Sequence, residues 1–249
     1  EYALRSEVRL FNCESEAELL LLNEVAKHVK ARPIVSLRVN PDIDAETHSY
    51  IATGLRKHKF GIEIEQASEI YLRHASLPHV RLEGVSCHIG SQITDTGIFF
   101  EAFDRLISLV SHLRKCGLDI TSLDLGGGLA IAYREGEVSP ALGDYASALA
   151  KAAEEKNLTL HLEPGRSIVG LAGVLLTKVL YRKHTDEKEF VVVDAAMNDL
   201  IRPALYESHH EIIPIVRRDD RLPLCADVVG PICETSDFLA RDREIKDVR

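Results

Sequence analysis

In residues 1–173, short apolar stretches alternate with amphipathic ones, and glycine or polar residues follow directly after the apolar stretches. Strands and helices that alternate in this way form parallel βαβ units. In a (β/α)8 barrel of the TIM type, the chemistry lies at the carboxyl ends of the strands. We therefore expect an α/β fold with a site at that edge. The expected strands cover residues 8–13, 34–39, 82–88, 122–125 and 160–163, and the expected helices cover residues 15–30, 66–75, 98–115 and 143–156.

The pattern changes near Val174, where strand-like stretches follow one another with only turns and short helical pieces between them. Only about five β/α units precede this point, which is too few to close an eight-stranded barrel. We therefore predict two domains, a partial barrel at residues 1–173 and part of a β-rich domain at residues 174–249. The strands expected in the second domain cover residues 174–181, 189–193, 211–215 and 224–229.

Composition excludes several classes of function. A net charge of −9 in 249 residues argues against binding to nucleic acid or to an anionic membrane surface. The apolar runs are too short to span a bilayer and no charged-then-apolar leader precedes them, so we expect a cytoplasmic protein. The five cysteines are an odd number without a CxxC pair, which favours reduced thiols.

The stretch LHLEPGRSIV, residues 160–169, brings a carboxylate, a proline, a glycine and an arginine to the end of an expected strand. Pro164 cannot donate to a ladder and Gly165 tolerates backbone angles closed to other residues, so the strand should stop at Glu163. An ionised carboxylate beside a pyridine nitrogen keeps that nitrogen protonated and makes the ring an electron sink. The alternative is a strand end with a solvated Glu163 and Arg166.

Two other strand ends carry residues that suit a phosphorylated ring. In CHIGSQ, the His88 imidazole can stack on a flat ring and the Ser91 hydroxyl can donate to a phosphate oxygen, although a lone histidine is more often structural. The three glycines at residues 126–128 let a backbone approach a ligand, and their N–H groups can form a nest for an anion; alone they also fit a loose turn. Together with Glu163, these residues indicate a phosphorylated pyridine.

The predicted second domain carries another group of candidate residues. Arg202 and Tyr206 are four apart in MNDLIRPALY and share one face if the segment is helical, which suits a substrate carboxylate. A surface ion pair beside a packed tyrosine explains the spacing equally well. Cys233 and Glu234 lie in the Gly/Pro turn GPICET, where a thiol could donate a proton, although an inert buried cysteine is commoner.

Taken together, these motifs closely resemble the diaminopimelate decarboxylase family. Its members are pyridoxal-phosphate-dependent enzymes of the alanine-racemase-like, ornithine-decarboxylase-like barrel type. The resemblance implies decarboxylation of meso-2,6-diaminopimelate at its D-configured carbon, which gives L-lysine and carbon dioxide as the last step of lysine biosynthesis. It runs through FNCESEAELLLLNEVA, SLRVNPDI, THSYIATG, KFGI, CHIGSQ, LDLGGGLAI, LEPGRSIV, MNDLIRPALY and GPICETSDFLA.

The resemblance also implies a role for each candidate residue. His88 stacks against the cofactor ring, Glu163 faces the ring nitrogen, Cys233 reprotonates the substrate carbanion, and Glu234 recognises the distal ammonium. No metal is implied. The implied catalytic residues are Cys233, His88 and Glu163; the cofactor-binding residues are His88, Ser91, Gly127, Gly128, Glu163, Pro164, Gly165 and Arg166; and the substrate-binding residues are Arg166, Arg202, Tyr206 and Glu234.

The family's architecture further implies a homodimer, in which the cysteine loop completes the site of the neighbouring subunit. By likeness to the ornithine decarboxylases, Lys59 pairs with Asp237 across that interface. The lysine that attaches the cofactor is implied to lie on an early barrel strand, upstream of the matching region. We therefore expect the chain to be a piece of a longer protein and to be inactive by itself, because missing barrel strands would leave a sheet edge open.

Three rival interpretations remain at this point. A related barrel decarboxylase could act on arginine, ornithine or a carboxylated polyamine, but a plain diamine tail offers no distal carboxylate for Arg202. A non-catalytic homologue could bind a partner through a degenerate site, since site residues rather than the fold carry function. A metal-dependent barrel hydrolase would need converging ligands, and His48, His58 and His88 show no ligand spacing.

Overall fold

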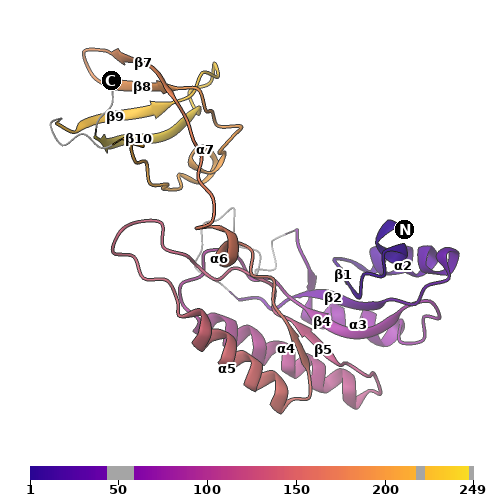
Figure 1. Ribbon diagram of the computed structural model, residues 1–249. Coiled ribbons are helices and arrows are strands. Elements are labelled where there is room, and N and C mark those ends of the chain that lie inside the picture. Colours follow the sequence, from indigo (N-terminus) through magenta and orange to yellow (C-terminus); the bar gives the residue numbers. More distant parts are fainter. Residues whose placement is uncertain (44–58, 217–221, 247–249) are drawn as a thin grey trace. The chain divides into compact units, whose positions relative to one another are not determined.

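The computed structural model describes residues 1–43, 59–216 and 222–246, and the chain divides into two compact units (Figure 1). Unit 1 comprises Glu1–Ile131 and Ser139–Leu171. Unit 2 comprises Ala132–Val138 and Ala172–Arg249. Residues 44–58, which include His48, His58 and the motif THSYIATG, lie outside the described residues.

Unit 1 is built on a parallel sheet with the strand order β1-β2-β4-β5-β6, and β3 pairs with the end of β2. Neighbouring strands are consecutive in the chain and helices connect most of them, which is the arrangement of part of a (β/α)8 barrel. The predicted fold class is therefore confirmed. The strands are β1 Leu10–Cys13, β2 Ile34–Asn40, β3 Ile62–Glu63, β4 Arg81–Ser86, β5 Ser122–Asp124 and β6 Thr159–His161; the helices are α1 Tyr2–Arg5, α2 Glu16–Val29, α3 Ile64–Arg73, α4 Gly97–Lys115, α5 Leu142–Glu155 and α6 Arg166–Val169.

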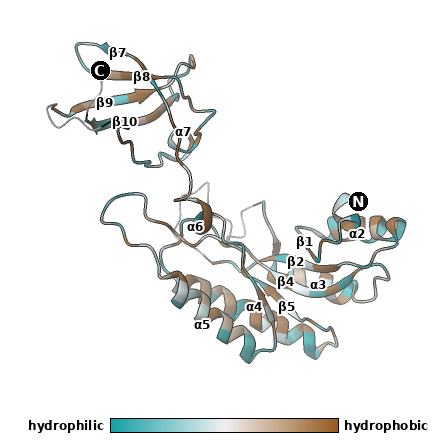
Figure 2. Cartoon of the chain, in the orientation of Figure 1, coloured by the Kyte–Doolittle hydropathy of each residue, from teal (hydrophilic) through white to brown (hydrophobic). Residues whose placement is uncertain are grey.

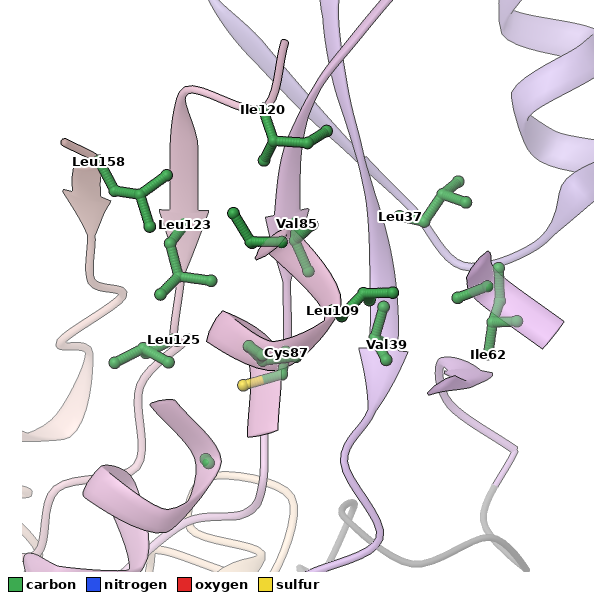
Figure 3. Close-up of a cluster of buried hydrophobic side chains, with 14 of the residues drawn as sticks. Leu37, Val39, Ile62, Val85, Cys87, Leu109, Ile120, Leu123, Leu125 and Leu158 are labelled. Atoms are coloured by element: carbon green, nitrogen blue, oxygen red, sulfur yellow. The ribbon is translucent and has the colours of Figure 1, made fainter. Parts of the chain in front are cut away.

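Side chains alternate between the two faces of this sheet, as the two-residue period of a strand requires. In β2, Val35, Leu37 and Val39 are fully or almost fully buried and belong to one large apolar cluster. Figure 3 shows Leu109 of α4 among the side chains of the neighbouring strands, and Figure 2 shows the helices of unit 1 apolar on one side and polar on the other. The opposite face of the sheet is polar, because Ser36 and its neighbours in register point there.

Helix α2 begins as the sequence predicts. The Ser15 side chain accepts a hydrogen bond from the Glu18 backbone N–H at 3.2 Å, which satisfies one of the unpaired donors of the first turn. The Glu18 carboxylate accepts from the backbone N–H of Glu14 at 2.6 Å, one residue earlier than in an ordinary capping box. Lys30, in the left-handed conformation, ends the helix.

Unit 2 contains a mixed sheet with the order β10-β9-β8-β7, in which β8 and β9 are parallel and the outer pairs are antiparallel. Its core comprises buried residues of β8, β9 and β10, with Ala195 just beyond β8. The segment Ala132–Val138, which the sequence places with the barrel, groups with this unit. The elements are β7 Val179–His184, β8 Glu189–Val193, α7 Arg202–Tyr206, β9 Leu224–Val229 and β10 Phe238–Ile245.

Two strand predictions in unit 2 are wrong. The strand expected at residues 174–181 begins only at Val179, because the exposed apolar residues before it have no neighbouring strand in the described chain. The strand expected at residues 211–215 does not form, since Pro214 cannot donate to a ladder and only Ile212 of this segment packs against the core.

Candidate functional site

The loops after β4, β5 and β6 meet at the carboxyl edge of the sheet in unit 1. The backbone N–H of Glu163 donates to the Gly126 carbonyl at 2.8 Å, and the N–H of Cys87 donates to the Asp124 carbonyl at 2.8 Å. The N–H of Ile93 donates to the Gly128 carbonyl at 2.9 Å. Three segments far apart in the sequence are thus fixed side by side, as the sequence predicts for the ends of neighbouring parallel strands.

The glycine loop lies so close to its neighbours that no side chain fits. A Cβ on Gly127 would lie 2.0 Å from the Glu163 carbonyl oxygen, and one on Gly128 would lie 2.1 Å from the Gly90 carbonyl oxygen. Gly128 also has φ +111°, which other residues rarely adopt. The three glycines are therefore required by the packing of the site loops and do not form a loose turn.

His88 is held against this loop by its ring. Its Nδ1 accepts a hydrogen bond from the backbone N–H of Gly127 at 3.1 Å, so the ring proton of the neutral imidazole lies on Nε2. Burial lowers the pKa of His88, and the nearby Arg38 guanidinium lowers it further, while Asp124 and Glu14 oppose this. A neutral imidazole with a fixed ring plane suits stacking on a flat ligand.

The depressed pKa of His88 predicts a pH dependence of stability. Below about pH 6.5 the unfolded chain protonates this histidine before the folded protein does, so the free energy of unfolding should fall as the pH falls through that value. His88→Asn keeps an acceptor near the Gly127 N–H and should reduce this loss. Urea unfolding between pH 7.5 and 5.5 measures it. His28→Asn, at an exposed site on α2, serves as the control, and equal slopes in all three proteins would contradict the prediction.

Glu163 lies among polar side chains that the sequence analysis missed. The Asn12 amide nitrogen lies 3.0 Å from the Asp124 carboxylate and 3.4 Å from that of Glu163. Ser36 donates to the Asn12 amide oxygen and lies 3.0 Å from the Ser86 hydroxyl. A signal was present, because Asn12, Ser36, Ser86 and Asp124 are polar residues within expected strands, but the sequence does not indicate which strands are neighbours.

Partial burial raises the pKa of the Glu163 carboxyl, and the neighbouring Asp124 carboxyl raises it further. Arg38 and Asn12 act in the opposite direction. A carboxyl with a raised pKa can share a proton with a basic ring nitrogen placed against it.

Gln92 ties the two outer loops together and was also missed as a site residue. Its amide oxygen accepts from the Arg166 guanidinium at 2.9 Å, and its amide nitrogen donates to the Ile131 carbonyl at 2.5 Å. Arg166 begins the short helix α6, directly after Pro164 and Gly165. Ser91, half-buried, immediately precedes Gln92 in the same loop. The cofactor residues predicted from the sequence thus all lie on these three loops of unit 1.

The other predicted site residues lie in unit 2. Arg202 and Tyr206 occupy one side of the short helix α7, and the Arg202 guanidinium lies 5.4 Å from the Tyr206 ring centroid and 5.6 Å from that of Tyr133. The guanidinium donates to the Ser208 hydroxyl at 3.1 Å. Its buried Nε has no hydrogen-bond partner within the described residues.

Cys233 and Glu234 lie in the turn between β9 and β10, and both are exposed. Asp237, which ends this turn, is only 3% exposed. Its carboxylate accepts from the backbone N–H groups of Met197 and Ile232, each at 2.7 Å. Asp237 therefore holds the turn in place. The ion pair with Lys59 of a neighbouring subunit stays a prediction.

Two further features of the described chain bear on function. Residues 1–43, 59–216 and 222–246 contain no group of three His, Cys, Asp or Glu side chains that could hold a metal ion. No helix in the same residues has the length and apolar character needed to cross a membrane.

Comparison with known proteins identifies the family. Residues 1–170 match the model for the pyridoxal binding domain of the pyridoxal-dependent decarboxylases. The chain belongs to this family. The matched residues contain all three loops of the candidate site in unit 1, and the recognition made from the sequence motifs is confirmed.

Curated relatives agree with the family match. The chain is 53% identical to the diaminopimelate decarboxylase of Pseudomonas aeruginosa over 243 residues, which are 98% of this chain and 58% of the relative. It is 47% identical to the diaminopimelate decarboxylase of Aquifex aeolicus over 247 residues, which are 99% of this chain and 59% of the relative. The chain thus spans about three fifths of the length of these relatives.

Solved structures share the fold. The crystal structure of diaminopimelate decarboxylase from Helicobacter pylori complexed with L-lysine matches with a TM-score of 0.90 and 38% identity, over 99% of this chain and 61% of that chain. A lysine decarboxylase from Selenomonas ruminantium matches with a TM-score of 0.81 at 23% identity, and this likeness concerns the fold alone.

The residues present fit pyridoxal phosphate. The site offers a carboxyl with a raised pKa for the ring nitrogen, a neutral imidazole with a fixed plane for the ring face, and the half-buried Ser91 hydroxyl for the phosphate. The carboxyl and the imidazole suit the pyridine ring, and the hydroxyl suits the phosphate, which are the two ends of the cofactor.

Proposed function

We propose that this chain carries the cofactor half and part of the substrate half of a diaminopimelate decarboxylase. The enzyme would convert meso-2,6-diaminopimelate to L-lysine and carbon dioxide with pyridoxal 5'-phosphate. The observation that carries the proposal is that His88 and Glu163 lie on either side of one glycine loop, within residues that match the pyridoxal binding domain. The names of the curated relatives support the choice of substrate.

The proposed cofactor site uses three loops of unit 1. When bound, pyridoxal phosphate supplies an electron sink that takes up the electron pair left by the departing carboxylate. Glu163 would hold a proton at the ring nitrogen, and His88 would cover one face of the ring. Ser91, Gly127, Gly128 and the backbone of Pro164, Gly165 and Arg166 would hold the phosphate.

The proposed substrate site uses side chains that bind the end of the substrate that does not react. Arg166, Arg202 and Tyr206 would bind carboxylate, and the unpartnered Nε of Arg202 supports this role. Glu234 would bind the distal ammonium. Meso-diaminopimelate carries an amino acid at each end, so recognition of one end decides which end reacts. Cys233 would then donate its thiol proton to the carbon that has lost its carboxylate.

We also propose that the enzyme is a cytoplasmic homodimer whose active sites are shared across the interface. The exposed Cys233 turn supports this arrangement, because a proton donor on an exposed turn can serve a neighbouring subunit. The free thiols of all five cysteines support a reducing compartment.

Substrate preference tests the proposed function. The protein, expressed from its complete reading frame and supplied with pyridoxal 5'-phosphate, should release carbon dioxide from meso-diaminopimelate at least about a hundredfold faster than from L-ornithine, L-arginine or L-lysine. The reason is that a site built to bind a polar end group rejects analogues that lack it. Trapped carbon dioxide and chromatographic detection of L-lysine measure the result.

Two controls sharpen this experiment. Arg202→Met should lower kcat/KM for meso-diaminopimelate while leaving cofactor binding unchanged, because it removes only a contact to the unreactive end. Glu154→Gln, on the exposed side of α5, should change neither quantity. A preference for ornithine or arginine would show that meso-diaminopimelate is not the substrate. A protein that binds no pyridoxal phosphate would refute the proposal.

A further inference from the structure

The Asp124 carboxylate sits next to Glu163 and is fixed on both of its oxygens. It is only 5% exposed. Oδ1 accepts from the Gly126 backbone N–H at 2.9 Å, and Oδ2 accepts from the Asn12 amide at 3.0 Å. Because one oxygen is held by the glycine loop and the other by Asn12 of β1, this carboxylate cannot turn freely away from Glu163.

Asn12 joins the two carboxyl groups. Its amide nitrogen lies 3.4 Å from Glu163 Oε1 as well as 3.0 Å from Asp124 Oδ2. The buried Ser36 hydroxyl donates to the amide oxygen of Asn12, so the amide nitrogen points toward the carboxyl groups and the opposite amide orientation is disfavoured. One orientation of Asn12 therefore serves both carboxyl groups.

We infer that Asn12 and Asp124 are positioning residues for Glu163, which rests on the proposed role of Glu163 at the pyridine nitrogen. Asp124 places a second carboxyl beside Glu163, so a cationic ring nitrogen arriving at Glu163 meets two carboxyl groups. Asn12 donates to Glu163 Oε1, which limits the orientations open to the other carboxyl oxygen. Neither residue needs to touch the cofactor to act in this way.

The surrounding charges agree with this arrangement. The Arg38 guanidinium lowers the pKa of Glu163, and it is itself paired with Glu14 at 2.6 Å. Burial raises the pKa of Cys87 to about 12, so its thiol is uncharged at neutral pH. Asp124 raises the pKa of Glu163, and the Asn12 hydrogen bond lowers it. The two positioning residues thus act on Glu163 in opposite directions.

Carboxyl-detected NMR titration of the protein labelled with ¹³C-glutamate tests this inference, with Glu163→Gln used to assign the signal. Asp124→Asn should lower the titration midpoint of Glu163, because the neighbouring charge is removed while an acceptor for the Gly126 N–H remains. Asn12→Ala should raise the midpoint, because a donor to the ionised carboxylate is lost. A purely structural role would not shift the midpoint in opposite directions.

Ser122→Ala is the matched control, since Ser122 lies two residues before Asp124 on the same face of β5 and contacts the Glu83 carbonyl instead of the carboxyl groups. In this variant the titration midpoint of Glu163 should equal that of the wild type. Midpoints of Glu163 that stay constant in Asp124→Asn and Asn12→Ala would overturn the inference. A parallel absorbance titration with pyridoxal 5'-phosphate separates this inference from the proposed function. If the midpoint of Glu163 shifts in the variants but the protein does not bind pyridoxal 5'-phosphate, the proposed function is refuted and the inference about Asn12 and Asp124 stands.

Discussion

Gly127→Ala should reduce the affinity for pyridoxal 5'-phosphate by about a hundredfold, which corresponds to about 3 kcal/mol of lost binding free energy. The new Cβ would lie 2.0 Å from the carbonyl oxygen of Glu163, and a backbone atom cannot move out of the way as the end of a side chain can. The loop after β5 or the loop after β6 must therefore shift. Either shift separates Glu163 from His88, which the Gly127 N–H holds.

Fluorescence titration with pyridoxal 5'-phosphate measures the affinity, and circular dichroism checks that the variant remains folded. Gly143→Ala is the control, because a Cβ at this position in α5 meets no atom within 4 Å. Alanine should be accommodated there without strain and leave the affinity unchanged. If Gly127→Ala bound the cofactor as tightly as the wild type, the glycine loop would not form part of the site.

Much of the fold followed from local patterns in the sequence. The alternation of apolar and amphipathic stretches predicted the parallel strands and their helices, and the residues after β4, β5 and β6 predicted the location of the site. These predictions succeeded because the ends of neighbouring parallel strands always meet at one edge of the sheet. Each of these strand ends can be recognised from a few neighbouring residues, because a proline, a glycine or a polar side chain marks it.

Features that depend on distant partners were not predictable in the same way. Asn12 bonds to Asp124 and Glu163, which follow it by 112 and 151 positions. The strand β10 was missed because its FLARDREI sequence is rich in charged residues. It also contains a bulge near Asp242, whose backbone N–H donates to the Asp227 carboxylate of β9, and this partner is distant in the sequence. The strand expected at residues 211–215 failed for the converse reason, since its apolar residues have no neighbouring strand to pair with.

A bulge in β4 decides which of its side chains face the site. The pairing of β2 with β4 shifts by one residue between Val35, opposite Leu82, and Ser36, opposite Gly84. Because side chains alternate along a strand, a shift of one residue transfers every later side chain to the other face. Ser86 consequently shares the polar face with Ser36, and the continuation of the strand brings His88 to the site.

Tyr71→Phe should lower the free energy of unfolding by about 2–4 kcal/mol, because it removes the hydroxyl that completes this bulge. The fully buried Tyr71 hydroxyl donates to the Gly84 carbonyl at 2.5 Å and accepts from the Leu37 N–H at 2.9 Å. Phenylalanine fills the same space but leaves both backbone groups unpaired in the core. Equilibrium unfolding in urea measures the loss.

Tyr145→Phe is the matched control, because Tyr145 is buried and its hydroxyl makes no hydrogen bond within the described residues. This substitution should change the free energy of unfolding by less than about 0.5 kcal/mol. Equal effects of the two substitutions would show that the hydroxyl of Tyr71 does not stabilise the bulge, and the position of His88 would then need another explanation.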